Sequence, residues 1–243
     1  RFEGHYQPRQ PLWGYELDND PKVVEKWIDV ATDHGVNVFV YDWYWYEGGP
    51  YLEGALNDGF LKARNNEKMQ FYIMWANHDV KYNYWNVHRY KDNTDILWNA
   101  KVDWENYKII VDRVIKQYFM RPNYFKINGE PVFSIFSIGK LLESFNNSAK
   151  DARKALDYFR AEVKKAGFPG LHIQWNQGGG SVMSEEAAAR FAGNVKTMGF
   201  NSVAMYNMGG TNEDYIVYGS NSIKIREQMD TILDVPVFPC VSI

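Results

Sequence analysis

Segments of helical periodicity alternate with short apolar runs along the whole chain. The first predicted helix begins at Asn19-Asp20-Pro21, an N-cap candidate followed by proline at the first helical position, and it ends at Gly35. Apolar residues at spacings of three and four predict further helices. These cover residues 53–63, 104–118, 151–166, 184–197 and 222–233.

Six apolar runs have the length and composition of buried strands: 36–43, 70–75, 132–136, 171–175, 202–206 and 237–241. Strands that alternate with helices predict a parallel sheet of the α/β class. An open doubly wound sheet is the alternative, but such folds place a glycine-rich loop after the first strand. In this chain Asp42-Trp43-Tyr44-Trp45 occupies that position, whereas 76–102 forms a long loop after the second strand.

A closed (β/α)₈ TIM barrel needs eight strands. The chain has no strand before its first predicted helix and stops just after its last strand. We therefore expect an incomplete TIM-type barrel with about six of the eight strands. Residues 1–243 are expected to form a single domain that is part of a longer one.

Charge and cysteine content exclude several classes of function. Lys and Arg total 27 against 30 Asp and Glu, which gives a net charge of −3, and no basic block could neutralise a nucleic-acid backbone. Cys240 is the only cysteine, so neither a disulfide within the chain nor a Cys-based zinc site can form. No apolar run reaches the ~18 residues of a membrane span.

Aromatic residues are abundant, with 9 Trp, 17 Tyr and 14 Phe, and many follow predicted strands. Active sites of α/β barrels form at these strand ends. Aromatic faces can stack on the C–H face of a sugar, while amides, carboxylates and imidazoles bind its hydroxyl groups. Core packing is the alternative role for any single aromatic residue. The predicted sugar-binding residues are Asp42, Trp43, Trp45, Trp75, Asn77, His78, Trp175, Asn176 and Tyr206.

Four carboxylates lie close to the predicted strand ends: Asp42, Glu47, Glu53 and Asp79. Glycosidic cleavage commonly uses two carboxyl groups, one as the acid and one as the base or nucleophile. We expect Glu47 or Glu53 to work with Asp79 in these catalytic roles. The alternatives are a solvated surface charge for each and, for Asp42, an outward side chain paired with a helix.

Other catalytic motifs are missing from the sequence. Gly178-Gly179-Gly180-Ser181 lacks the Lys of a phosphate-binding loop, and no Gly-x-Ser-x-Gly elbow occurs. The five histidines show no HExxH spacing, and His78 with Asp79 alone does not make a metal site. We therefore expect neither a cofactor nor a metal ion.

Several segments together resemble the glycoside hydrolase family 99-like group, which includes WbsX-type proteins encoded with bacterial surface-polysaccharide genes. The likeness covers most of the chain. It is carried by Gly4-His5-Tyr6-Gln7-Pro8, Leu12-Trp13-Gly14-Tyr15, His34 to Phe39, Tyr41 to Tyr46, Leu52-Glu53, Trp75-Ala76-Asn77 and Asn128 to Phe133.

The resemblance implies a (β/α)₈ barrel that acts on glycans, and it adds His5 and Gln7 to the expected sugar-binding residues. In family 99 itself it implies endo-acting, retaining cleavage of α-mannosides. WbsX-like relatives have Trp-Ala-Asn-Glu where this chain has Trp75-Ala76-Asn77-His78, so a histidine replaces the glutamate. Their later Trp-Asn-Glu-Trp segment lies beyond Ile243.

The leading hypothesis is a glycoside hydrolase that cleaves an α-linked, mannan-like or bacterial surface polysaccharide. The alternatives are a glycosyl-transferring enzyme of polysaccharide assembly and a glycan-binding barrel without catalysis. The expected partner is an oligosaccharide or polysaccharide, and the expected location is extracytoplasmic, in the periplasm or on the surface of a bacterium. The sequence does not indicate an oligomeric state.

Overall fold

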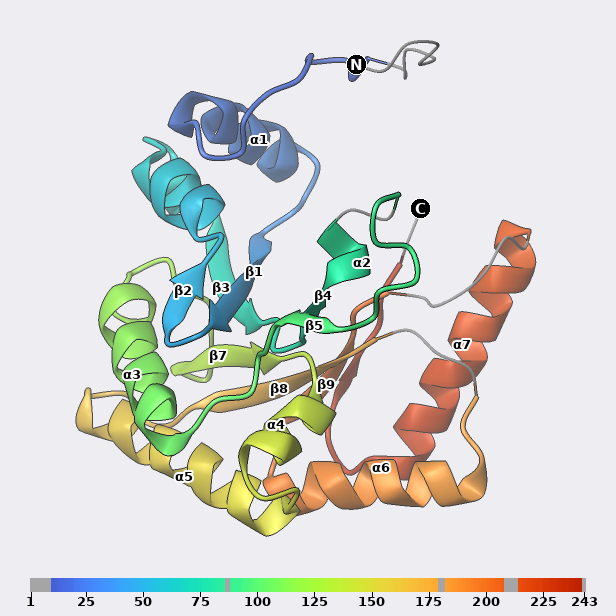
Figure 1. Ribbon diagram of the computed structural model, residues 1–243. Helices are drawn as coiled ribbons and strands as arrows, with labels where there is room; N and C mark the ends of the chain where they lie inside the picture. The colour runs from blue at the N-terminus through green and yellow to red at the C-terminus, as the bar shows by residue number, and fades with distance from the viewer. Residues whose placement is uncertain (1–9, 86–87, 179–181, 208–213, 242–243) are drawn as a thin grey trace. The chain divides into compact units, whose positions relative to one another are not determined.

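The computed structural model describes residues 10–85, 88–178, 182–207 and 214–241 (Figure 1). The chain divides into two compact units. The smaller unit comprises Arg1–Phe39 and Leu52–Gln70, and the larger unit comprises Val40–Tyr51 and Phe71–Ile243. The prediction that all 243 residues belong to one domain stays a prediction.

The smaller unit is built around helix α1 (Pro21–Asp33), which begins where the sequence predicts. The Asp20 side chain accepts a hydrogen bond from the Lys22 backbone N–H at 2.9 Å and caps the helix. The predicted helix over 53–63 forms as a π turn, η1 (Ala55–Gly59), and a 3₁₀ turn, η2 (Phe60–Lys62), and η3 (Asn66–Lys68) is a further 3₁₀ turn. Val24, Ile28, Leu56, Phe60 and Met69 are buried and form its core.

The larger unit contains the main sheet except for the first residues of two strands, and the strand order is β10-β9-β8-β7-β3-β1, with the short strand β2 (Gly49–Tyr51) beside β1. All six predicted strands are present as β1 (Val38–Tyr46), β3 (Gln70–Trp75), β7 (Glu130–Ile135), β8 (His172–Gln177), β9 (Ser202–Met205) and β10 (Val237–Phe238). The neighbours from β3 through β7, β8 and β9 to β10 pair in parallel. The α/β class with a largely parallel sheet is therefore confirmed, while closure into a barrel stays a prediction.

Two short strands pair in the antiparallel direction with the main strands. β2 (Gly49–Tyr51) forms a hairpin with β1, and β6 (Lys126–Ile127) forms one with β7. The sequence predicts a turn at Asn128-Gly129-Glu130-Pro131, between β6 and β7, but neither short strand, because strands of two or three residues are too short to show an alternating pattern.

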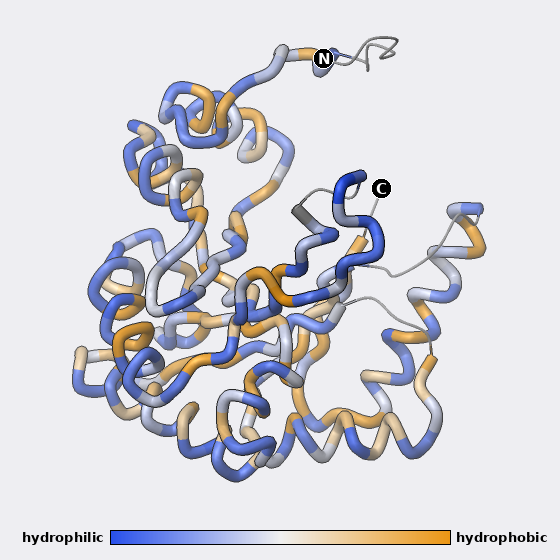
Figure 2. The backbone as a smooth tube through the Cα atoms, viewed as in Figure 1, coloured by the Kyte–Doolittle hydropathy of each residue, from blue (hydrophilic) through white to orange (hydrophobic). Residues whose placement is uncertain are grey.

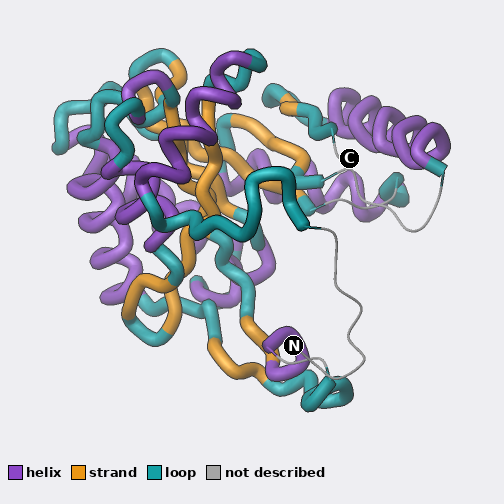
Figure 3. The backbone as a smooth tube through the Cα atoms, turned by 90° about the horizontal axis from the view of Figure 1, so that it is seen from above, coloured by secondary structure: helices purple, strands orange, loops and turns teal. Residues whose placement is uncertain are grey.

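Helices of the larger unit lie on the outer side of its strands (Figures 1 and 3). They are α3 (Trp104–Val114), which continues as the π turn η4 (Ile115–Phe119), α4 (Ile138–Ser144), α5 (Ala149–Lys165), α6 (Glu185–Met198) and α7 (Tyr215–Ile232). Hydrophobic and hydrophilic residues alternate along α5 and α6 (Figure 2). Phe119 stacks on Phe159 at 5.8 Å between ring centroids, and Phe133 of the sheet contacts Phe159 at 5.0 Å.

The structure extends the predictions in three places. The expected loop 76–102 contains strands β4 (Val80–Lys81) and β5 (Ile96–Trp98) and helix α2 (Tyr82–Trp85), and α4 was not predicted. Helix α7 begins seven residues before the predicted start at residue 222. Its first turn exposes Tyr215, Ile216 and Val217 to solvent, so it lacks the apolar stripe that marks a helix in a sequence. Among the described residues, no helix is both long enough and apolar enough to span a lipid bilayer.

Tyr124 joins strands β3 and β7 through a buried hydroxyl group, which donates to the Val132 carbonyl at 2.7 Å and accepts from the Ile73 N–H at 3.3 Å. We predict that Tyr124→Phe lowers the free energy of unfolding by about 1–3 kcal/mol, because both backbone groups lose a buried partner. Urea denaturation followed by circular dichroism measures this change. Tyr215→Phe on the exposed start of α7 is the matched control and should shift the unfolding curve little.

Candidate functional site

A cavity of about 660 Å³ lies along one face of the sheet in the larger unit. Alternate residues of a strand point to the same face. The cavity is accordingly lined by Val40 and Asp42 of β1, Gln174 and Asn176 of β8, and Ala204 of β9. The remaining lining residues are Tyr72, Phe125, Ile127, Met205, Tyr206, Phe238 and Pro239.

Asp42 lies in this cavity beside two tyrosines. The Tyr206 hydroxyl donates a hydrogen bond to Asp42 Oδ2 at 3.4 Å, and Tyr44 also hydrogen-bonds to the carboxyl group. Burial raises the pKa of Asp42, against the opposing effects of Tyr206, His78 and Tyr44. Burial and the nearby Asp42 charge also raise the pKa of Tyr44 to about 12, so its hydroxyl stays protonated at neutral pH. An outward Asp42 paired with a helix, the alternative considered from the sequence, is wrong.

Four aromatic side chains surround this carboxyl group, and we call them the aromatic rim: Tyr44, His78, Phe136 and Tyr206. His78 contacts Tyr44 and Phe136 edge-on, each at 5.9 Å between ring centroids. Phe136 contacts Tyr206 edge-on at 5.2 Å. The rim brings together side chains from the ends of four strands, as the sequence predicts for the active end of an α/β barrel.

The sequence analysis assigned His78, Asp42 and Tyr206 to the site but missed Tyr44 and Phe136. Tyr44 could have been found from strand geometry, since it lies two residues after Asp42 and therefore on the same face. Phe136 follows β7 directly, but no polar residue beside it marks it as part of a site.

Asn77 holds the backbone before His78 to the neighbouring strand end. Asn77 Nδ2 donates to the Ser137 carbonyl at 2.8 Å, and the Ser137 N–H donates to Asn77 Oδ1 at 2.7 Å. The Asn77 side chain is 1% exposed. The structure therefore gives Asn77 a structural role in place of the predicted contact with sugar hydroxyls.

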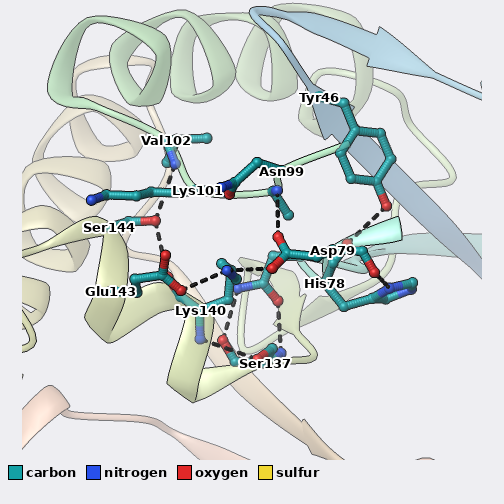
Figure 4. Close-up of polar contacts among 12 residues, drawn as sticks. Tyr46, His78, Asp79, Asn99, Lys101, Val102, Ser137, Lys140, Glu143 and Ser144 are labelled. Carbon is teal, nitrogen blue, oxygen red and sulfur yellow. Dashed lines mark hydrogen bonds and ion pairs between the residues drawn. The ribbon is translucent and has the colours of Figure 1, made fainter. Parts of the chain in front are cut away.

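Asp79 is held by partners within the protein, as Figure 4 shows. Its Oδ1 accepts from the Ala100 N–H at 2.8 Å, and its Oδ2 lies 2.7 Å from Lys140 Nζ. Lys140 also pairs with Glu143 at 2.5 Å. Burial alone would lower the pKa of Lys140, but the two carboxylates outweigh burial and raise it. Asp79 does not line the cavity, and its predicted catalytic role stays a prediction.

The tryptophans predicted to stack on sugars belong to the hydrophobic core. Trp43, Trp45 and Trp75 are 1%, 3% and 1% exposed. In β1 the two tryptophans alternate with Asp42 and Tyr44, so they point to the opposite face. Trp175 is half-buried and stacks on Phe191 at 4.4 Å between ring centroids. Core packing, the alternative considered from the sequence, is therefore correct for the three buried tryptophans.

The remaining predicted site residues lie in different surroundings. Glu47 is exposed at the turn between β1 and β2, where its φ of +50° falls in the left-handed region. Glu53 belongs to the smaller unit, where it accepts a hydrogen bond from Asn57 Nδ2 at 3.1 Å. His5 and Gln7 lie outside the described residues.

Asn176 is the cavity residue with an unused polar atom. Its side chain is only 7% exposed, its Nδ2 lies 2.8 Å from the Met74 sulfur, and its Oδ1 has no hydrogen-bond partner. A buried carbonyl oxygen without a partner costs free energy until a donor reaches it. Asn176 Oδ1 is therefore an unsatisfied polar atom beside the cavity. In the described parts of the chain, no three His, Cys, Asp or Glu side chains cluster as a metal site would require.

Lys140 should matter strongly for stability. Its removal leaves Asp79, whose side chain is 15% exposed, without its cation. We predict that Lys140→Met lowers the free energy of unfolding by about 3 kcal/mol. Because the pair raises the pKa of Lys140, this stabilisation is present at neutral pH and is lost only as the pH rises through the folded-state pKa. Lys154→Met, which breaks the exposed pair with Asp151, is the control and should cost less than about 1 kcal/mol in the same urea titration.

Solved structures similar to this chain share its fold. A protein described as glycoside hydrolase-like matches with a TM-score of 0.59 and 16% identity, over 100% of this chain and 68% of its own. The GH99 endo-alpha-mannosidase from Bacteroides thetaiotaomicron matches with a TM-score of 0.51 and 13% identity, over 93% of this chain and 55% of its own. At these identities the matches show that the fold is similar to that of the GH99 TIM-barrel enzymes.

Among curated proteins, the chain is similar to the uncharacterized protein WxcX of Xanthomonas campestris pv. campestris. The two are 21% identical over 192 residues, which is 73% of this chain and 24% of the relative. The chain thus spans about a quarter of the length of the curated relatives that it matches. The model of the family described as glycosyltransferase WbsX matches residues 1–233, and the chain therefore belongs to the WbsX family.

Proposed function

We propose that this protein is a carbohydrate-active enzyme that acts on a glycan in the cavity beside the aromatic rim. The observation that carries the proposal is the position of Asp42, a carboxyl group with a raised pKa between two tyrosine hydroxyls in a cavity. The WbsX family and the GH99-like fold support the same class of enzyme.

The lining of the cavity suits a sugar ring. Tyr72, Phe125 and Phe238 offer apolar surface for C–H groups, while Gln174, Asn176 and Asp42 offer hydrogen-bond partners for hydroxyl groups. Tyr72 and Gln174 already hydrogen-bond to each other at 3.3 Å, so their polar atoms are held in place before a ligand binds.

Hydrolysis of an α-linked polysaccharide, mannan-like or from a bacterial surface, is the reaction we favour. A carboxyl group with a raised pKa can remain protonated and donate its proton to the glycosidic oxygen as the bond breaks. Asp42 has the surroundings for this acid role. Glu47, Glu53 and Asp79 stay as the predicted candidates for the second catalytic group.

Glycosyl transfer is the second candidate, and the description of the matching family as a glycosyltransferase favours it. The same acid could act during transfer, with a sugar hydroxyl as the attacking group in place of water. A glycan-binding protein without catalysis is a third outcome that experiment must separate from both.

A glycan screen tests the proposal. The protein is incubated with α-mannans and bacterial surface polysaccharides, alone and with nucleotide sugars, and the products are identified by chromatography and mass spectrometry. Shorter glycans without a donor indicate hydrolysis, donor-dependent extension indicates transfer, and binding without turnover indicates a non-catalytic protein. A protein that neither binds nor changes any glycan would contradict the proposal.

Asp42→Asn should reduce turnover of the glycan found in this screen by about 10²–10⁴-fold, because an amide cannot supply the proton. Asp112→Asn, on an exposed position of α3, is the matched control and should leave the rate unchanged. Glu47→Gln, Glu53→Gln and Asp79→Asn, assayed in parallel, identify any second catalytic carboxylate. Full activity of Asp42→Asn would remove Asp42 from the mechanism.

We also predict the effect of Asp42→Asn on stability. Because burial raises the pKa of Asp42, the carboxyl group favours folding most at pH values below its unfolded pKa, and this contribution is lost as the pH rises through the folded-state pKa. Asp42→Asn should therefore be as stable as the wild type or slightly more stable at pH 7. Thermal unfolding at pH 4 and pH 7 measures this, and a large loss of stability at pH 7 would indicate a structural role instead.

A further inference from the structure

We propose that His78 is the proton acceptor of this site and works through its Nε2 atom opposite the acid Asp42. The inference rests on the proposed function and assigns to an imidazole the role that the sequence reserves for a second carboxylate. It is carried by one hydrogen bond, by the way the backbone around His78 is held, and by the place of its ring in the aromatic rim.

The hydrogen bond fixes which nitrogen carries the proton. His78 Nδ1 lies 3.2 Å from the carbonyl oxygen of Asp79 (Figure 4). A carbonyl oxygen can only accept, so Nδ1 must be the donor and must carry a hydrogen. In the neutral ring Nε2 then has a free lone pair and can accept a proton.

Hydrogen bonds anchor the backbone on both sides of His78 and so restrict the movement of its imidazole ring. Asn77 is fastened to Ser137 by its two amide hydrogen bonds, and Asp79 is fastened to Lys140 and to the Ala100 N–H. The Tyr46 hydroxyl donates to the carbonyl of His78 itself at 3.0 Å. A base oriented by fixed neighbours is the arrangement that general-base catalysis requires.

The ring of His78 lies in the aromatic rim and is partly exposed to solvent. His78 is half-buried, and its edge contacts with Tyr44 and Phe136 hold it in the aromatic rim. Tyr44 in turn hydrogen-bonds to Asp42, and the charges of Asp42 and His78 influence one another. The imidazole and the carboxyl group therefore belong to one site.

His78 and Asp42 together can balance the protons of the reaction: His78 accepts one proton and Asp42 donates one. As a hydroxyl oxygen forms its bond to the anomeric carbon, His78 Nε2 takes the proton from that hydroxyl. The bond between the anomeric carbon and the glycosidic oxygen breaks, and Asp42 gives its proton to the departing oxygen. The hydroxyl is water in hydrolysis or a sugar hydroxyl in transfer. Solvent then removes the proton from His78 and returns one to Asp42.

Charged and titratable groups from several elements lie around His78. Asp42, Tyr44 and Tyr46 face it from β1, Asp79 follows it in the chain, and Lys140 approaches from α4. Lys140 is engaged by two carboxylates. The proposal predicts that activity falls on the acid side of the pH profile, because a protonated base at residue 78 cannot accept a proton.

Long-range ¹H–¹⁵N correlation spectra of protein labelled at histidine test the tautomer without any substrate. His78, assigned by its absence in His78→Asn, should show a protonated Nδ1 and an unprotonated Nε2 above pH 8. His34 is an internal reference, since its Nδ1 lies 2.7 Å from the Val30 carbonyl oxygen and must also be the donor. A His78 ring protonated at Nε2 would overturn the proposal.

Kinetics on a glycan that the protein turns over test the role. His78→Asn keeps an N–H near the position of Nδ1 but has no base, and it should lower kcat by about 100-fold or more. His78→Glu supplies a carboxylate base and should recover part of the activity, with the acid limb at lower pH because a carboxylate is a weaker base than an imidazole. His88→Asn, at an exposed position, is the control and should match the wild type.

The outcomes separate this inference from the proposed function. If no glycan is turned over or bound, the proposed function fails. If turnover is found and His78→Asn retains it, with an unchanged pH profile, the function stands and the role of His78 is refuted. If His78 had a purely structural role, His78→Asn would be inactive, and His78→Glu would neither recover activity nor shift the acid limb. That result would show that His78 is not the base.

Discussion

The hydrogen bonds between Asn77 and Ser137 join the ends of two neighbouring parallel strands, and the arrangement of the candidate site depends on them. β3 and β7 pair in register through Trp75 and Ile135, and the Asn77 side chain continues this pairing beyond the last strand residues. An amide can satisfy the backbone N–H and C=O groups of one residue at the same time. The chain can therefore leave the sheet at this point with its polar groups still paired, and His78 and Phe136 are brought into contact.

Two kinds of carboxyl group lie near these hydrogen bonds. Some pair with a lysine and stabilise the structure, and one remains available for chemistry. Asp79 and Glu143 both pair with Lys140, which is largely buried, so their interactions stabilise the connection between β3 and α4. Among the described residues, Asp42 forms hydrogen bonds to the hydroxyl groups of Tyr44 and Tyr206, and it lies in a cavity. Carboxyl groups that lack a cation are destabilised in their charged form by burial, and such groups are more common at functional sites than elsewhere.

The chain belongs to the WbsX family, and its fold is similar to that of the GH99 enzymes. The resemblance found in the sequence implies a glutamate after Trp-Ala-Asn, and this chain has His78 at that position. The fastening of Asn77 does not depend on the next side chain, since it uses the Asn77 amide and the Ser137 backbone. A change from carboxylate to imidazole can therefore occur at residue 78 without loss of the local fold.

The sequence by itself determined the order of the strands, most of the helices, the family and the end of the sheet at which the site lies. These features follow from local patterns: apolar periodicity, helix caps such as Asp20, and the polar residues after each strand. It could not decide which of two adjacent strand residues faces the cavity, because Asp42 and Trp43 occur in the same aromatic run. Tertiary structure decided this, since the packing of Trp43 and Trp45 in the core turns Asp42 and Tyr44 toward the cavity. It also decided that Lys140, 61 residues away in the chain, pairs with Asp79, whereas among the described residues no ion pair forms with Asp42. Pairings between residues so distant in the sequence leave no periodic signal, and they form only when the sheet brings the strand ends together.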